Sequence, residues 1–197
     1  MPNWCENTLE IWGEEEEKMN EFYEFFGCVI GTSVSGKLQE NFNFNHILPM
    51  PQELEGTRSP SNIVSQEEYD KVQELKKLYN IKDTQDVIRL RKENKITEEE
   101  RDMMWRGGIT QELSDRLKSE YGSDNWYDWA NNNWGTKWDI KGDIGLNDVD
   151  TESCSFTFNT AWTPPEPIVD KLREMFPELT FSGMYVGEGY EFAGVFE

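Results

Sequence analysis

The two ends of the chain each repeat a strand–helix–strand pattern, and this pattern restricts the fold more than any other feature. Strands are indicated by residues that alternate between two faces, and helices by apolar residues three or four apart. The expected strands are 4–12, 41–48, 136–141, 153–162 and a pair within 179–196 joined by the turn at 187–189. The expected helices of these ends are 14–27 and 164–176. A sheet assembled from both ends of the chain follows.

This element order is that of a ferredoxin-like plait, an antiparallel sheet with two helices on one face. We therefore predict an α+β fold with a helical insertion. The plait is expected to comprise residues 1–51 and 122–197, and the insertion residues 52–121. The term describes topology only, because the cysteine spacing of an iron–sulfur protein is absent from the sequence.

The middle of the chain has helical signals and a different charge balance. Ser65 with Glu68 and Thr97 with Glu100 fit capping boxes, which start helices. Residues 52–121 hold 16 acids and 13 bases, whereas the rest of the chain holds 23 acids and 6 bases. The insertion is thus nearly balanced within a strongly acidic chain.

The net charge of −20 restricts the partners. Such a field repels the phosphates of nucleic acids and anionic membranes, and it favours basic partners. Direct nucleic-acid binding is not expected, unless the 13 bases of the insertion gather on one face. The start of the chain lacks a basic segment followed by an apolar run, and three cysteines suit a reducing compartment. We therefore expect a cytoplasmic protein without a membrane span.

No set of catalytic residues stands out, because carboxylate pairs are common in so acidic a chain and single out no site. His46 is the only histidine, and no nucleophile, histidine and acid form a recognisable set. Cys5, His46 and Cys154 could meet on neighbouring strands, but their spacing is unlike that of zinc motifs. Four aspartates surround a glycine-containing turn without EF-hand spacing: Asp139, Asp143, Asp148 and Asp150. No metal or cofactor is expected, and the sequence selects no reaction.

Residues 124–139 hold four of the eight tryptophans together with several asparagines. We expect Trp129 and Trp138 to pack in a core, and Trp126, Trp134 and Lys137 to face outward. Flat rings beside hydrogen-bonding groups are typical of nucleotide or sugar pockets. The candidate binding residues are Asn3, Trp4, Glu6, Asn7, His46, Trp126, Asp128, Trp134, Lys137 and Trp162.

Four segments are familiar together: MPNWCENTLEIWG, FNFNHILPMP, NWYDWANNNWGTKWD, and FNTAWTPPEP with the later YEFAG. They resemble the YubB-like proteins encoded by phages and plasmids. The resemblance covers both ends of the chain and excludes most of 52–121. It implies a ferredoxin-like domain and a home on a mobile element in a bacterial host. It implies no reaction.

Two classes of function remain open. The first is a non-enzymatic accessory protein that binds and modulates a host protein, itself basic or nucleic-acid-binding, through an acidic surface. In a variant of this hypothesis the insertion recognises the partner and the plait is a scaffold. The alternative is a small-ligand pocket of nucleotide or sugar type, or an enzyme of unknown reaction.

Overall fold

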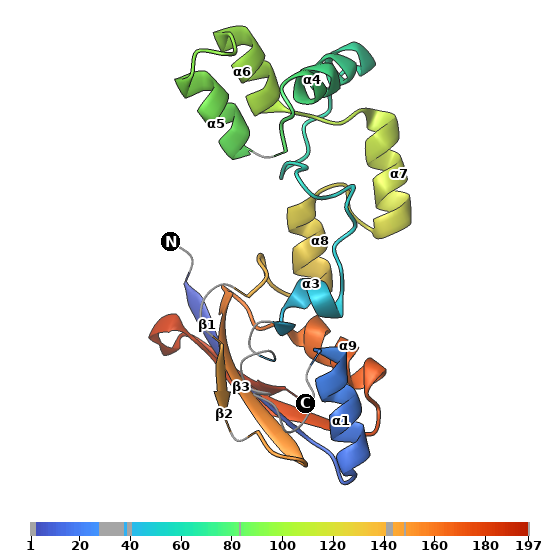
Figure 1. Cartoon of the computed structure of the whole chain (residues 1–197), viewed down its shortest axis with the longest axis vertical. Coiled ribbons are helices and arrows are strands. Elements are labelled where there is room, and N and C mark those ends of the chain that lie inside the picture. The colour runs from blue at the N-terminus through green and yellow to red at the C-terminus, as the bar shows by residue number, and fades with distance from the viewer. Residues whose placement is uncertain are drawn as a thin grey trace. The chain divides into compact units, whose positions relative to one another are not determined.

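The computed structural model describes residues 3–27, 38, 41–82, 84–140, 144–147 and 149–196. The chain divides into two compact units. The sheet unit comprises Met1–Pro49 and Ala130–Glu197, and the helical unit comprises Met50–Trp129. The division falls inside helix α8 (Trp126–Asn133). Figure 1 shows both units.

The sheet unit contains one antiparallel sheet with strand order β2-β3-β1-β4-β5. Its strands are β1 (Trp4–Trp12), β2 (Gly145–Asn147), β3 (Ser153–Ala161), β4 (Thr180–Gly187) and β5 (Ala193–Phe196). β1 lies between β3 and β4, and helix α9 (Glu166–Met175) connects those two strands. This split arrangement is the topology of a ferredoxin-like plait with an additional edge strand. The predicted fold class is confirmed.

One face of the sheet is covered by α9, α1 (Glu16–Phe25) and the short α3 (Phe44–Ile47) (Figure 1). The core between sheet and helices is largely aromatic. Phe42 stacks on Phe156 with ring centres 4.1 Å apart, and Phe22 meets Phe181 edge-on at 6.2 Å. Buried aromatic pairs of this kind add to the stability that burial alone provides.

The strand predicted at 41–48 is wrong, because this segment forms α3. Two side chains satisfy the free N–H groups at its start. The Asn43 side chain accepts a hydrogen bond from the His46 amide (2.8 Å). The Asp139 carboxylate accepts from the amides of Phe44 (2.7 Å) and Asn45 (3.1 Å). Unpaired amides at a helix start are costly, so these two caps decide the local structure.

The strand predicted at 136–141 is also wrong for residues 136–140: residues 136–139 form bends, and Ile140 lies in no helix or strand. Thr136 is buried and donates its hydroxyl to the Ala161 carbonyl (2.9 Å), and Asp139 caps α3. The edge strand that pairs with β3 on the side away from β1 is the three-residue β2, which lies further along the chain. The predictions that concern Lys141, Asp143 and Asp148 lie outside the described residues.

The helical unit contains α4 (Gln66–Leu78), α5 (Thr84–Lys92), α6 (Glu98–Arg106) and α7 (Gln111–Tyr121). Ser65 and Thr97 cap α4 and α6 as predicted, and Thr97 with Glu100 completes a capping box. Leu75, Val87 and Met104 form a small apolar core.

Asp124 ties three parts of the helical unit together, although its carboxylate is buried. It accepts hydrogen bonds from the hydroxyls of Ser61 and Ser114, both at 2.6 Å, and from Lys118 Nζ at 2.9 Å. Asn125 Nδ2 donates a further bond at 3.0 Å. Burial alone raises the pKa of this carboxyl, but the four donors outweigh it and hold the pKa below its ordinary value.

Candidate interaction surface

The second face of the sheet carries no described helix. Residues opposite one another in the strand register point to the same face. Thr8 lies opposite Met184, and Met184 lies opposite Val195. Three apolar side chains on this face are well exposed: Trp12 by 41%, Met184 by 62% and Val195 by 56%. Apolar residues are therefore presented to solvent across β1, β4 and β5.

The charge of this face is negative. Glu6 and Glu10 point outward from β1 and are exposed. None of the five described strands contains a lysine, arginine or histidine. We call the surface made by Glu6, Glu10, Trp12, Met184 and Val195 the acidic sheet face. Exposed carboxylates beside exposed apolar groups suit a partner that offers both basic and apolar side chains.

A notch of about 330 Å³ lies where β1 begins and β3 and β4 end. It is lined by Asn3, Trp162, Phe192 and the carboxylates Glu188 and Glu191. The Trp4 amide donates to Glu188 Oε2 (3.0 Å), and the Trp162 amide donates to the Asn3 carbonyl (3.0 Å). Trp162 is 47% exposed and Phe192 is 39% exposed.

Two rings and two carboxylates form a site for a cation, since the face of an aromatic ring attracts positive charge. A cation already lies against one of these rings: Lys137 Nζ is 5.4 Å from the centre of the Trp162 ring and 4.5 Å from that of Trp138. The acids of the notch would repel a phosphate.

The structure brings half of the predicted site residues together at this end of the sheet. Asn3, Trp4 and Trp162 meet at the notch, Lys137 lies on Trp162, and Glu6 follows on the acidic sheet face. The alternation of WCENTLEIW correctly indicates that Trp4 and Glu6 lie on the same face of β1.

The other predicted residues lie elsewhere. Asn7 is fully buried and bonds the carbonyls of Cys5 (3.0 Å) and Phe158 (3.2 Å). Trp134 is buried and donates Nε1–H to the Leu48 carbonyl, so its expected outward orientation is wrong. His46 is exposed on α3, with Nε2 3.0 Å from the Phe25 carbonyl. Trp126 and Asp128 belong to the helical unit.

The expected core role of Trp129 is confirmed, because only 4% of its surface is exposed. Its neighbour Trp126 is half-buried. The Trp126 amide donates to Thr57 Oγ1 (2.9 Å), and Asp128 accepts from Asn125 Nδ2 (2.8 Å). Asn125 Oδ1 accepts from the Asp128 amide (3.0 Å), so Asn125 caps the start of α8, and the Asp128 carboxylate holds the Asn125 side chain in place.

The two cysteines that the structure describes are buried rather than poised for chemistry. Burial raises the pKa of the Cys5 thiol to about 11, and Cys154 is also buried. Across the described ranges, no three side chains of His, Cys, Asp or Glu are grouped so that they could hold a metal ion. None of the helices within those ranges is long and apolar enough to cross a membrane.

Sequence reasoning missed Met184, Val195, Phe192, Glu188 and Glu191. The first two follow from the register of β4 and β5, which the alternation of residues 179–196 indicated without showing which face is covered. The remaining three lie around the turn between these strands, and the sequence does not show that Trp162 is their neighbour.

Residues 133–197 match the family model described as "Ferredoxin-like domain in Api92-like protein". This segment contains β2 to β5 and α9. The match supports the ferredoxin-like topology of the sheet unit, to which the N-terminal β1 and α1 also belong. A crystal structure of the protein api92 from Yersinia pseudotuberculosis is similar at 12% sequence identity and a TM-score of 0.39, with 99% of this chain and 93% of that chain covered. No curated protein matches the chain.

Proposed function

We propose that this chain is a non-enzymatic accessory protein of a phage or plasmid that binds a basic host protein with its acidic sheet face. The observation that carries the proposal is the composition of that face: exposed Glu6 and Glu10 beside exposed Trp12, Met184 and Val195, on strands without a basic side chain. The mobile-element setting is supported by the resemblance of four segments to YubB-like proteins.

Long-range charge supports the same partner. The sheet unit holds 21 acids and 6 bases. Its field accelerates the approach of a basic surface, and the apolar side chains supply the contact that remains once the partner has docked. A nucleic-acid-binding host protein is the class that fits best, since its basic surface is adapted to a polyanion.

The notch supplies a second contact with the same partner. Trp162 and Phe192 offer ring faces, and Glu188 and Glu191 offer carboxylates. A lysine or arginine side chain of the partner satisfies both groups at once. The acidic sheet face and the notch thus both favour a positively charged partner.

The test is capture of basic, nucleic-acid-binding proteins from bacterial lysate at about 0.05 M and 0.5 M salt, which changes the screening length several-fold. The variant Glu6→Gln with Glu10→Gln removes two charges from the acidic sheet face. Glu16→Gln with Glu17→Gln removes two exposed charges from α1 and is the matched control. Trp162→Ala tests the notch.

We expect the captured basic protein to be lost at high salt and reduced by the first pair and by Trp162→Ala, but retained by the control pair. Capture that is equal at both salt concentrations contradicts an electrostatic partner. Equal losses with both glutamate pairs contradict the assignment to this face.

A further inference from the structure

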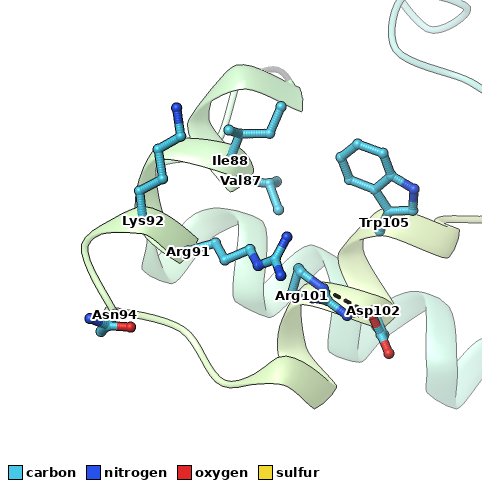
Figure 2. A pocket seen from close by; sticks show the side chains of 8 residues that line it. All are labelled: Val87, Ile88, Arg91, Lys92, Asn94, Arg101, Asp102 and Trp105. Carbon is cyan, nitrogen blue, oxygen red and sulfur yellow. Dashed lines mark hydrogen bonds and ion pairs between the residues drawn. The ribbon is translucent and has the colours of Figure 1, made fainter.

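Two adjoining cavities of the helical unit share one exposed tryptophan. The first, of about 700 Å³, lies between α5 and α6 and is lined by Val87, Ile88, Arg91 and Trp105 among others (Figure 2). The second, of about 720 Å³, is lined by Arg58, Arg106, Trp126 and again Trp105. Trp105 is 46% exposed. We call the two cavities together the Trp105 groove.

The Trp105 groove is positively charged in a chain of net charge −20. Its lining contains the bases Arg58, Arg91, Lys92, Arg101 and Arg106, against one acid, Asp102. Arg101 pairs with Asp102, as the dashed line in Figure 2 shows, and with Glu98. Among the residues that the structure describes, no ion pair joins Arg58, Lys92 or Arg106 to an acid.

Arg58 is held beside the end of α6, close to the tryptophan. Its Nε is 3.3 Å from the position that a Cβ at Gly107 would occupy, two residues after Trp105. Asn62 Nδ2 donates to the Gly107 carbonyl (2.9 Å), which fixes this loop to the end of α6. Burial and then the charge of Arg58 lower the pKa of Lys76. An anion in the groove would relieve this repulsion.

The exposed ring of Trp105 favours a ligand that contains an aromatic ring. Figure 2 shows the Trp105 ring at one side of the first cavity, across from Val87 and Ile88, with the Arg91 guanidinium below Val87 and directed toward Arg101. Rings stack well on an exposed indole, and arginine binds phosphate through two parallel hydrogen bonds. The volume of each cavity lies in the range of ligand sites, roughly 300–1,000 Å³.

We propose that the Trp105 groove binds a mononucleotide, with the base stacked on Trp105 and the phosphates held by Arg58 and Arg106. Five of the 13 bases of the insertion line this groove. This site is independent of the acidic sheet face. Its ligand is an anion, whereas the partner proposed for the acidic sheet face is basic.

A compact ligand is favoured over a polymer. Charges more than about 10 Å away are screened at ordinary salt, so phosphates inside the groove respond mainly to its five bases and to the acids paired with two of them, Asp102 and Glu98. A nucleic-acid strand that continues beyond the groove meets the field of a chain with net charge −20. A mononucleotide and a single strand offer the same base and phosphate groups. Comparing the affinities of the two therefore shows which of them the groove prefers.

The test is isothermal titration calorimetry of the full chain without divalent cations. The ligands are ATP, adenosine, tripolyphosphate and a single-stranded DNA of about ten nucleotides, long enough to pass beyond one site. We expect ATP to bind roughly 10-fold or more tightly than adenosine or tripolyphosphate, because each of these keeps only one of the two contacts. The single strand is expected to bind more weakly than ATP.

Three variants assign the binding to the groove. Trp105→Ala is expected to weaken ATP by about 10-fold through loss of stacking, and Trp105→Phe to retain most of the affinity because it keeps a ring. Arg58→Gln with Arg106→Gln is expected to weaken ATP by about 10-fold or more. The matched control is Lys77→Gln with Lys82→Gln, two exposed lysines of the same unit outside both cavities, with a change below about twofold.

Circular dichroism of each variant verifies that it is folded. Absence of ATP binding at millimolar concentration overturns the proposal. So does tighter binding of the single strand than of ATP, or an equal loss of affinity in the control pair and the Arg58/Arg106 pair.

Discussion

Replacing Asp124 by asparagine tests how far one buried charge stabilises the helical unit. The carboxylate accepts four hydrogen bonds, and only 6% of its side-chain surface is exposed. In Asp124→Asn, one oxygen becomes an NH₂ group. Whichever oxygen is replaced, the new donor faces a group that cannot accept: Lys118 Nζ on one side or Asn125 Nδ2 on the other.

Removing one partner of a buried charged pair costs about 3–5 kcal/mol. Lys118 is 55% exposed and regains water, so we expect the lower end, about 3 kcal/mol. That free energy corresponds to roughly a 100-fold change in an opening equilibrium. Hydrogen exchange of the α7 amides measures this opening directly, and urea unfolding measures the total loss of stability.

Asp115→Asn is the matched control, because Asp115 lies on the exposed side of α7 and accepts one bond, from Gln111 Nε2 (2.8 Å). Its expected cost is below about 0.5 kcal/mol. A cost for Asp124→Asn as small as that of the control would refute the role given to the network.

The pH dependence tests whether charge is responsible. The pKa of Asp124 is lowered in the folded state from an ordinary 3.8. A lowered acid pKa contributes stability that is fully present above the ordinary value and is lost as the pH falls through it toward the folded value. The difference between wild type and Asp124→Asn should therefore be largest near neutral pH and decrease below about pH 4. A constant difference would indicate packing instead.

Two further predictions concern the sheet unit. Gly183 has a φ of +153°, and a Cβ there would lie 2.0 Å from the Thr8 carbonyl oxygen. Gly183→Ala should therefore lower the free energy of unfolding by about 3 kcal/mol or more, measured by thermal unfolding. Ser182→Ala on the same strand is the control. Cys5 should react slowly with iodoacetamide at pH 8, because its thiol is buried and its pKa is raised to about 11. Peptide mass spectrometry with and without urea measures this protection, and equal labelling in both conditions would contradict it.

The sequence alone was sufficient wherever periodicity and local caps decide structure. β1 and β3 alternate along their length, the β4–β5 pair is indicated by the turn between its strands, and α1 and α9 carry apolar stripes. The caps at Ser65 and Thr97 involve residues three positions apart. Such signals lie within one element, so they can be recognised without knowledge of its neighbours.

The tertiary structure decided what depends on distant partners. Phe42 and Phe44 alternate as in a strand, yet Asp139, about 95 residues away, supplies two of the hydrogen bonds that make this segment a helix start. The segment therefore forms a helix instead of the expected strand, and β2 is the edge strand of the plait. Trp134 likewise became a core residue through the Leu48 carbonyl.

The candidate sites divide in the same way. The alternation of β1 determined that Trp4, Glu6 and Trp12 share a face, but only the register placed Met184 and Val195 beside them. The bases around Trp105 come from three separated segments, and no local pattern connects Arg58 with Arg91 and Arg106. Sequence periodicity fixes the side of an element on which a residue lies; packing between elements determines which residues it meets there.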